Sequence, residues 1–168
     1  MKKGFTFGEI FILIVIIIIV LAVVVVALNP GKILAKSRDS RRYADVTTLA
    51  TAVNLYLADG KVFDGTALIG GQEYKSTAQD KAAAGENNGT GWAKIDLTKI
   101  SSGTPLAKLP IDPINNDTYF YAIGFNVKEN TYEINCAFED KDNVPKQSID
   151  GGNNTGRYEV GTNLEILA

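Results

Sequence analysis

One uninterrupted apolar run most constrains what this chain can fold into. Residues 10–28 are consecutive apolar residues without a charge, a glycine or a proline. As a helix, residues 5–28 would be about 36 Å long, enough to cross a hydrocarbon core of about 30 Å. A single segment in lipid satisfies its backbone only as a helix, so we expect one membrane-spanning helix over residues 5–28. A cleaved secretory signal is the alternative, but its apolar region is normally only about 7–15 residues long.

Charge is unevenly distributed along the chain. Residues 29–42 hold five basic side chains and one acidic side chain, whereas residues 43–168 hold ten basic and seventeen acidic ones. A basic collar beside an apolar segment, followed by an acidic body, is typical of a protein at a membrane surface. Because the acidic body would repel phosphate, we do not expect nucleic acid as a partner.

The sequence contains no histidine and a single cysteine, Cys136. The commonest general base and the commonest zinc ligand are therefore missing, and an intramolecular disulfide is excluded. The serines lie in no nucleophile motif, and the chain has no P-loop. We therefore expect a structural or binding protein and not an enzyme.

The segment after the apolar run predicts a second, amphipathic stretch of helix. Pro30 and Gly31 should break the helix, because proline removes a backbone donor and glycine adds conformational freedom. Residues 29–59 then carry apolar side chains at three- and four-residue steps, and Asp59-Gly60 is a stop signal. These positions are Tyr43, Val46, Leu49, Ala50, Val53, Tyr56 and Leu57.

The remainder predicts an irregular segment followed by a sheet. Residues 60–117 are rich in Gly, Asn and Thr, which favours an irregular connection with at most a short helix at 75–84. Residues 118–168 alternate with period two in three runs, around Tyr119–Ile123, Tyr132–Phe138 and Tyr158–Ile166, with a hairpin turn at 128–130. The expected fold is therefore α+β, with a C-terminal antiparallel sheet of three to four strands that covers the amphipathic helix.

The residues ahead of the apolar run carry a specific resemblance. Residues 2–9, KKGFTFGE, place a short basic leader before Gly4, then Phe5 and Thr6, with Glu9 as the fifth residue after the Gly4–Phe5 bond. This resembles the class III leader junction of bacterial type IV pilins and type II secretion pseudopilins. The resemblance implies a type IV pilin fold, in which residues 1–4 are a leader that a prepilin peptidase removes after Gly4 before it N-methylates Phe5.

Glu9 is unusual because a carboxylate inside a membrane costs at least about 2.5–3.5 kcal/mol. No basic residue on the apolar helix can pair with it. Cleavage would create a cation, the amine of Phe5, and the resemblance implies that Glu9 meets this amine on its own chain or on a neighbouring subunit, as a registry device for assembly. The alternative is that Glu9 lies among the lipid headgroups, at a helix N-terminus that favours a carboxylate.

The resemblance also implies partners and a location. The chain would polymerise with copies of itself through residues 5–28, with membrane lipid, the prepilin peptidase, an inner-membrane assembly platform and an assembly ATPase as further partners. The leader would be cytoplasmic and the head outside, in a single-pass membrane protein that later enters an extracellular or periplasmic filament. The positive-inside rule alone would place the body in the cytoplasm. An alternative function is a membrane-tethered extracytoplasmic binding module that does not polymerise.

A second stretch is similar to major pseudopilins. Residues 109–113, LPIDP, followed by Tyr119 and Tyr121, resemble the segment that leads into the pseudopilin sheet, although pilus and pseudopilus both stay open. Major pseudopilins often bind calcium before their last strands, and oxygen-bearing side chains suit this cation. The implied Ca²⁺ ligands are Asp140, Asp142, Asn143 and Asp150; the alternative is a solvated acidic loop.

Overall fold

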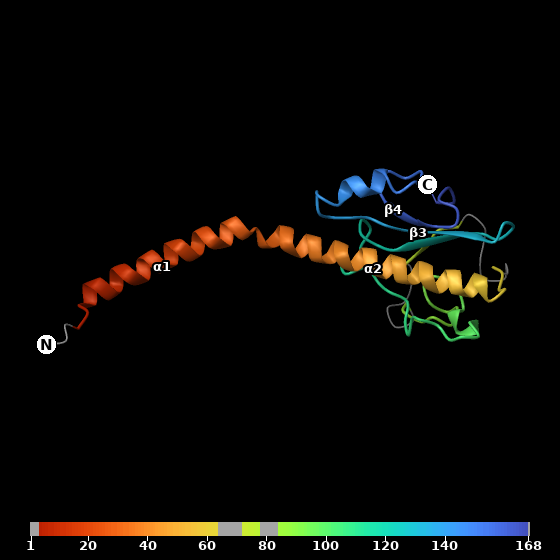
Figure 1. The fold of residues 1–168 in the computed structure, drawn as a ribbon, viewed down its shortest axis with the longest axis horizontal. Helices are drawn as coiled ribbons and strands as arrows, with labels where there is room; N and C mark the ends of the chain where they lie inside the picture. The colour runs from red at the N-terminus through yellow and green to blue at the C-terminus, as the bar shows by residue number, and fades with distance from the viewer. Residues whose placement is uncertain (1–3, 64–71, 78–83, 168) are drawn as a thin grey trace. The chain divides into compact units, whose positions relative to one another are not determined.

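The structure, a computed structural model, describes residues 4–63, 72–77 and 84–167. It has the expected α+β fold, with a long N-terminal helical stretch and a four-stranded antiparallel sheet (Figure 1). The chain divides into two compact units, Met1–Ala35 and Lys36–Ala168. The elements are the helices α1 (Phe7–Leu28) and α2 (Pro30–Ala58), the 3₁₀ helices η1 (Leu97–Lys99) and η2 (Val144–Ser148), and the strands β1 (Tyr74–Lys75), β2 (Ala122–Asn126), β3 (Thr131–Cys136) and β4 (Tyr158–Gly161).

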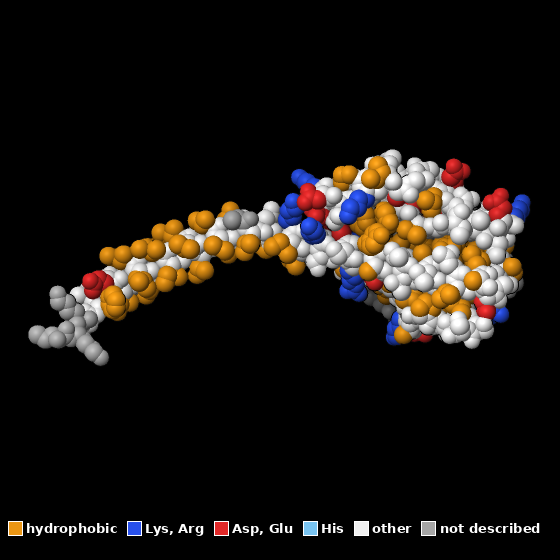
Figure 2. All heavy atoms as spheres, viewed as in Figure 1, with side chains coloured by type: hydrophobic (Ala, Val, Ile, Leu, Met, Phe, Trp, Pro, Cys, Tyr) orange, Lys and Arg blue, Asp and Glu red, His pale blue; other side chains and the backbone are white. Residues whose placement is uncertain are grey.

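Helix α1 is apolar on all sides and begins at a capping box. Thr6 is the N-cap, in extended backbone with φ −75° and ψ 155°, and its hydroxyl accepts the N–H of Glu9. Every described side chain of α1 is exposed, and Figure 2 shows hydrophobic side chains along its visible face. Within the described residues, the stretch Phe7–Ala58 is the one helical stretch long and apolar enough to cross a membrane.

The interruption predicted at Pro30 and Gly31 falls instead at Asn29, because both predicted residues lie within the first turn of α2. This residue is left-handed, with φ 43°, and it ends α1 by donating its N–H to the carbonyl of Val26. Its side-chain oxygen also accepts the N–H of Lys32 at 3.3 Å, so the same residue caps the start of α2. Pro30 opens α2, where the missing N–H of a proline leaves no helical bond unmade.

The stripe predicted on α2 forms part of the main core. Its buried members are Val46, Leu49, Ala50, Val53 and Tyr56. Tyr43, predicted in the same stripe, is instead 50% exposed, and its ring lies 5.6 Å from that of Tyr158. After Ala58 the helix stops: the N–H of Gly60, with φ 74°, bonds to the carbonyl of Leu57.

The sheet has the strand order β1-β2-β3-β4, antiparallel throughout. The predicted hairpin turn joins β2 to β3, and Ile123 lies opposite Ile134, which in turn lies opposite Val160. Side chains of one face enter the core with α2, as the hydroxyl of Tyr132 shows by donating to the carbonyl of Ala50 at 3.1 Å. The helix therefore lies under this face of the sheet (Figure 1).

The first and last predicted runs form strands, β2 and β4, that are shorter than the alternating pattern predicted. The first run does not begin at residue 118, because the side-chain oxygen of Asn116 accepts the N–H groups of Thr118 and Tyr119 and makes a turn there. The last strand ends at Gly161, and residues 162–167 cross onto the second face of the sheet, where Leu167 is buried.

The connection at 60–117 contributes more than a loop. Strand β1 extends the sheet, and buried side chains from 92–100 join the core, including Trp92. In the short helix expected at 75–84, Lys75 is instead a strand residue, and residues 78–83 lie outside the described part of the chain.

Candidate functional site

The N-terminal junction places the expected cleavage point outside the helix. Gly4 and Phe5 precede α1 and are exposed, with 78% of Phe5 accessible to solvent. A peptide bond ahead of a helix has no helical hydrogen bonds to break before a peptidase binds it. The Gly4–Phe5 bond therefore lies outside the hydrogen-bonded turns of α1.

Glu9 is held by its own chain. Its Oε2 accepts the backbone N–H of Thr6 at 2.7 Å and the Thr6 hydroxyl at 2.9 Å. These donors satisfy part of a carboxylate that can accept about four hydrogen bonds, and capacity remains for a further donor such as an amine. The capping box was not part of the sequence prediction, although Thr6 followed three residues later by Glu9 is its usual signature.

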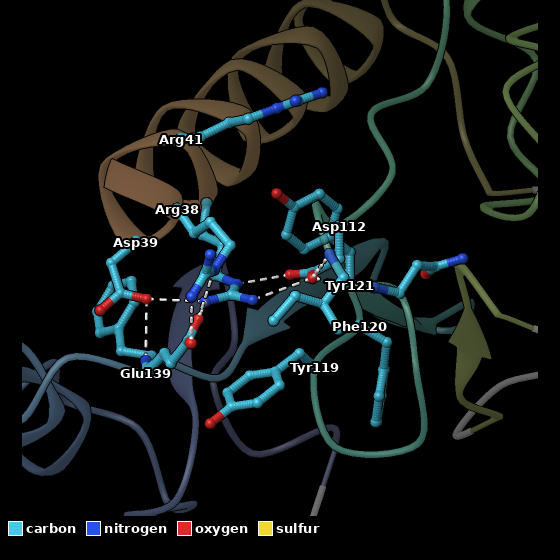
Figure 3. Close-up of polar contacts among 12 residues, drawn as sticks. Arg38, Asp39, Arg41, Asp112, Tyr119, Phe120, Tyr121 and Glu139 are labelled. Carbon is cyan, nitrogen blue, oxygen red and sulfur yellow. Dashed lines mark hydrogen bonds and ion pairs between the residues drawn. The ribbon is translucent and has the colours of Figure 1, made fainter. Parts of the chain in front are cut away.

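A second polar site lies in the head (Lys36–Ala168), around Arg42 of α2. Figure 3 labels four residues around it: Asp39, Asp112, Tyr119 and Glu139. The guanidinium of Arg42 is fully buried and binds Asp112 twice, from Nε at 2.6 Å and from Nη2 at 3.1 Å. Nη1 donates to Asp39 Oδ1 at 2.9 Å and to Glu139 Oε2 at 3.3 Å. The ring of Tyr119 lies 4.6 Å from the guanidinium carbon, within cation–π distance.

Asp39 connects α2 to the turn after β3. Its Oδ1 accepts the N–H of Glu139 at 2.9 Å, and its Oδ2 accepts the N–H of Asp140 at 2.8 Å. Arg38, one residue before it, binds the Glu139 carboxylate through Nε at 2.8 Å. One helical turn therefore holds both the segment at 109–113 and the turn at 139–140.

The electrostatics of this network are mutually reinforcing. Burial alone would lower the pKa of Arg42, but the hydrogen bonds and charges of Asp112, Asp39 and Glu139 raise it above its ordinary value. The hydrogen bond from Arg38 lowers the pKa of Glu139, against the opposing effect of burial. Arg42 is therefore a permanent buried cation, and its role is to fix the head and not to exchange protons.

Sequence reasoning counted Arg42 only as a member of the basic collar. A signal for its burial was present, because Arg42 precedes Val46 by four residues and so lies on the apolar face of α2. Asp112, from the LPIDP stretch, also accepts the N–H groups of Ile114 and Asn115. That stretch is thus bound to α2 by an ion pair that the sequence pattern did not reveal.

The residues expected to bind calcium have other partners. Asp150 accepts the N–H groups of Gly152 and Glu159, and Asn143 binds Asp39 and Lys146 through its amide. Asp140 is buried, with Oδ1 accepting the N–H of Asp142 at 3.5 Å. No group of three or more acidic, cysteine or histidine side chains that could hold a metal ion occurs among the residues described. The expected calcium site therefore gains no support from the arrangement.

Comparisons with protein-family models, curated proteins and solved structures gave no match.

Proposed function

We propose that the chain is a structural subunit of a type IV pilus or pseudopilus filament. In this proposal it is inserted as a prepilin, cleaved after Gly4, N-methylated on Phe5, and polymerised through α1. The observation that carries the proposal is the junction KKGFTFGE directly ahead of a helix whose described side chains are all apolar or capping and all exposed.

The exposure of α1 along its described length is consistent with a helix that is covered first by lipid and later by other subunits. Transferring apolar surface out of water gains roughly 25 cal/mol per Å², so such a helix would not stay in water. Lipid can cover it before assembly, and the same helices of other subunits can cover it afterwards. Repeating one head-to-tail interface without closure generates a fibre.

The capping box supports a dual role for Glu9. Before assembly, two donors from Thr6 reduce the cost of holding its carboxylate at the edge of the membrane. After cleavage, the remaining acceptor capacity suits the Phe5 amine of the same or a neighbouring subunit. Each partner would relieve the desolvation of the other, so that subunits in the wrong register would leave a charge unpaired.

Substitutions at Glu9 separate this role from simple helix capping. Glu9→Gln keeps an oxygen that can accept from Thr6 but removes the negative charge, whereas Thr6→Val removes the capping hydroxyl and keeps the charge. We expect Glu9→Gln to insert and be cleaved normally but to yield few filaments, and Thr6→Val to retain most of the yield. Normal filament yield from Glu9→Gln would leave Glu9 as a helix cap only.

The intact mass of the purified protein tests the processing step. The proposal requires a chain that begins at methylated Phe5, and filaments that are visible by electron microscopy. A tethered binding module that does not polymerise would begin at Met1 and form no filaments. A reporter fused to the C-terminus should be active only outside the cytoplasm, and a cytoplasmic signal would reverse the proposed orientation.

A further inference from the structure

The C-terminal segment (residues 162–167) covers the face of the sheet that lies away from α2. Leu167 is buried there with Phe120 and Ala122, in an apolar cluster separate from the main core. This close approach depends on Gly124, because a Cβ at that position would lie 2.6 Å from Leu167 Cδ2. The C-terminal segment therefore packs closely over, and covers, an apolar strip formed by Phe120, Ala122 and Gly124.

A buried carboxylate holds the cover in place. Glu133 of β3 is 0% exposed, and its Oε2 accepts the N–H of Ile166 and the N–H of Leu167, each at 2.9 Å. In the described chain this side chain is the anchor for the backbone of the C-terminal segment at these two residues. Anything that moves Glu133 must therefore loosen the cover.

A second buried carboxyl group neighbours Glu133. Glu159 of β4 is 2% exposed, and its Oε2 accepts the N–H of Asn154 at 3.0 Å. Its Oε1 has no hydrogen-bond partner among the described residues, and the β3–β4 register sets Glu159 opposite Asn135, diagonally beside Glu133 on the same face of the sheet. Both groups are acceptors when ionised, so a hydrogen bond between them requires one proton.

Among the described residues no cation makes a hydrogen bond or ion pair with Glu133 or Glu159, although the charge of Arg157 acts on Glu159 from a distance. Arg157, just before β4, is directed to neutral partners, with Nε donating to Asn135 at 2.6 Å and Nη2 to the carbonyl of Phe120 at 2.7 Å. Asp150, from the preceding loop, accepts the N–H of Glu159 and adds a further negative charge. Glu165 on the cover is exposed to solvent.

Burial, followed by the hydrogen bond with Glu133 and the negative charges of Glu133 and Asp150, raises the pKa of Glu159 to about 7. A raised carboxyl pKa stabilises the folded arrangement at acidic pH. That stabilisation is lost as the pH rises through neutrality.

We propose that one proton shared by Glu133 and Glu159 latches the C-terminal segment onto the sheet, and that its loss to solvent base releases residues 164–167, while the backbone bonds of Thr162 and Asn163 to the carbonyl of Tyr132 remain. Without the proton, two adjacent carboxylates would be buried with no ion pair to either of them among the described residues. Moving one of them into water relieves this cost and carries the segment away, which uncovers the strip around Phe120, Ala122 and Gly124. The latch does not depend on whether the chain polymerises.

Amide exchange in the full-length chain in detergent micelles tests the latch. The amides of Ile166 and Leu167 are followed by NMR from pH about 5 to about 9, with rates corrected for base catalysis. Between the ordinary carboxyl pKa of about 4.3 and a pH of about 7, their protection should fall by up to about tenfold for each pH unit and then level off, since opening releases one proton. The amide of Ile134 in the main core should keep its protection, and unchanged protection of the two tail amides over this range would overturn the proposal.

Substitution of Glu159 tests whether its carboxyl group carries the proton. In Glu159→Gln the side-chain NH₂ group can donate to Glu133 at any pH, because its protons do not titrate. The amides of Ile166 and Leu167 should therefore remain protected over the whole range. Glu165→Gln, on the same segment but exposed, is the matched control, and its amide protection should show the wild-type pH dependence. A Glu159→Gln chain that titrates like the wild type would refute the latch, and if this variant does not fold, the wild-type titration alone decides.

Discussion

Replacing Arg42 should strongly destabilise the head, because its buried guanidinium is the counter-charge of two buried carboxylates. Arg42→Met keeps an unbranched side chain of similar reach but removes the cation that faces Asp112, Asp39 and Glu139. Asp112 and Asp39 are each at most 4% exposed, so they would stay buried without their counter-charge. Removing one partner of a buried ion pair costs about 3–5 kcal/mol, a large part of the roughly 5–15 kcal/mol that stabilises a typical protein.

The chain contains its own probe for this measurement. Its single tryptophan, Trp92, is 1% exposed and donates its indole N–H to the carbonyl of Pro110 at 2.9 Å, next to the segment that Arg42 holds. Urea unfolding of the full-length chain in micelles, followed by Trp92 fluorescence, gives the free energy of unfolding.

Matched variants make the result specific. Arg41→Met removes a neighbouring, 64% exposed arginine that lies 3.5 Å from Asp45, and it should cost less than about 1 kcal/mol. Adding Asp112→Asn to Arg42→Met should restore part of the lost free energy of unfolding, because it removes a buried carboxylate that has lost its counter-charge. If Arg42→Met is as stable as Arg41→Met, the network does not hold the head together and the reasoning is refuted.

Three further outcomes follow from the head. The hydrogen bond from Arg38 lowers the pKa of Glu139, so the ion pair stabilises the fold above the usual carboxyl pKa, and this stabilisation is lost as the pH falls through the lowered value. The urea midpoint of the wild type should therefore drop on acidification. The drop should be smaller in Arg38→Met. Gly124→Ala should cost about 1–3 kcal/mol in urea unfolding, because the new Cβ meets the C-terminal segment. Burial raises the pKa of Cys136 to about 12, so iodoacetamide should modify this thiol only in the unfolded chain, and rapid labelling under native conditions would contradict its position in the core.

Local patterns in the sequence were sufficient for the main elements of the fold. The apolar run predicted α1, the three- and four-residue spacing predicted the buried face of α2, and residues 128–130 predicted the hairpin. Each of these signals is contained within a few turns or a few strand residues, where side-chain period and turn chemistry act directly. The same is true of the capping box at Thr6 and Glu9, which is readable from two residues three positions apart.

Only the tertiary structure decided how the charged residues of the head are used. Arg42 and Asp112 are 70 positions apart, and nothing local distinguishes this arginine's carboxylate partner from the other acids of an acidic body. Glu133 and Glu159 occupy strand positions that normally face water, yet the C-terminal segment lies over Glu133 and the loop at 150–154 lies over Glu159. The sequence by itself therefore determined the two long helices, the β2–β3 hairpin and the membrane-compatible segment. Strand β1 and the burial of the charges depended on which distant segments lie beside them, a long-range choice that no local periodicity encodes.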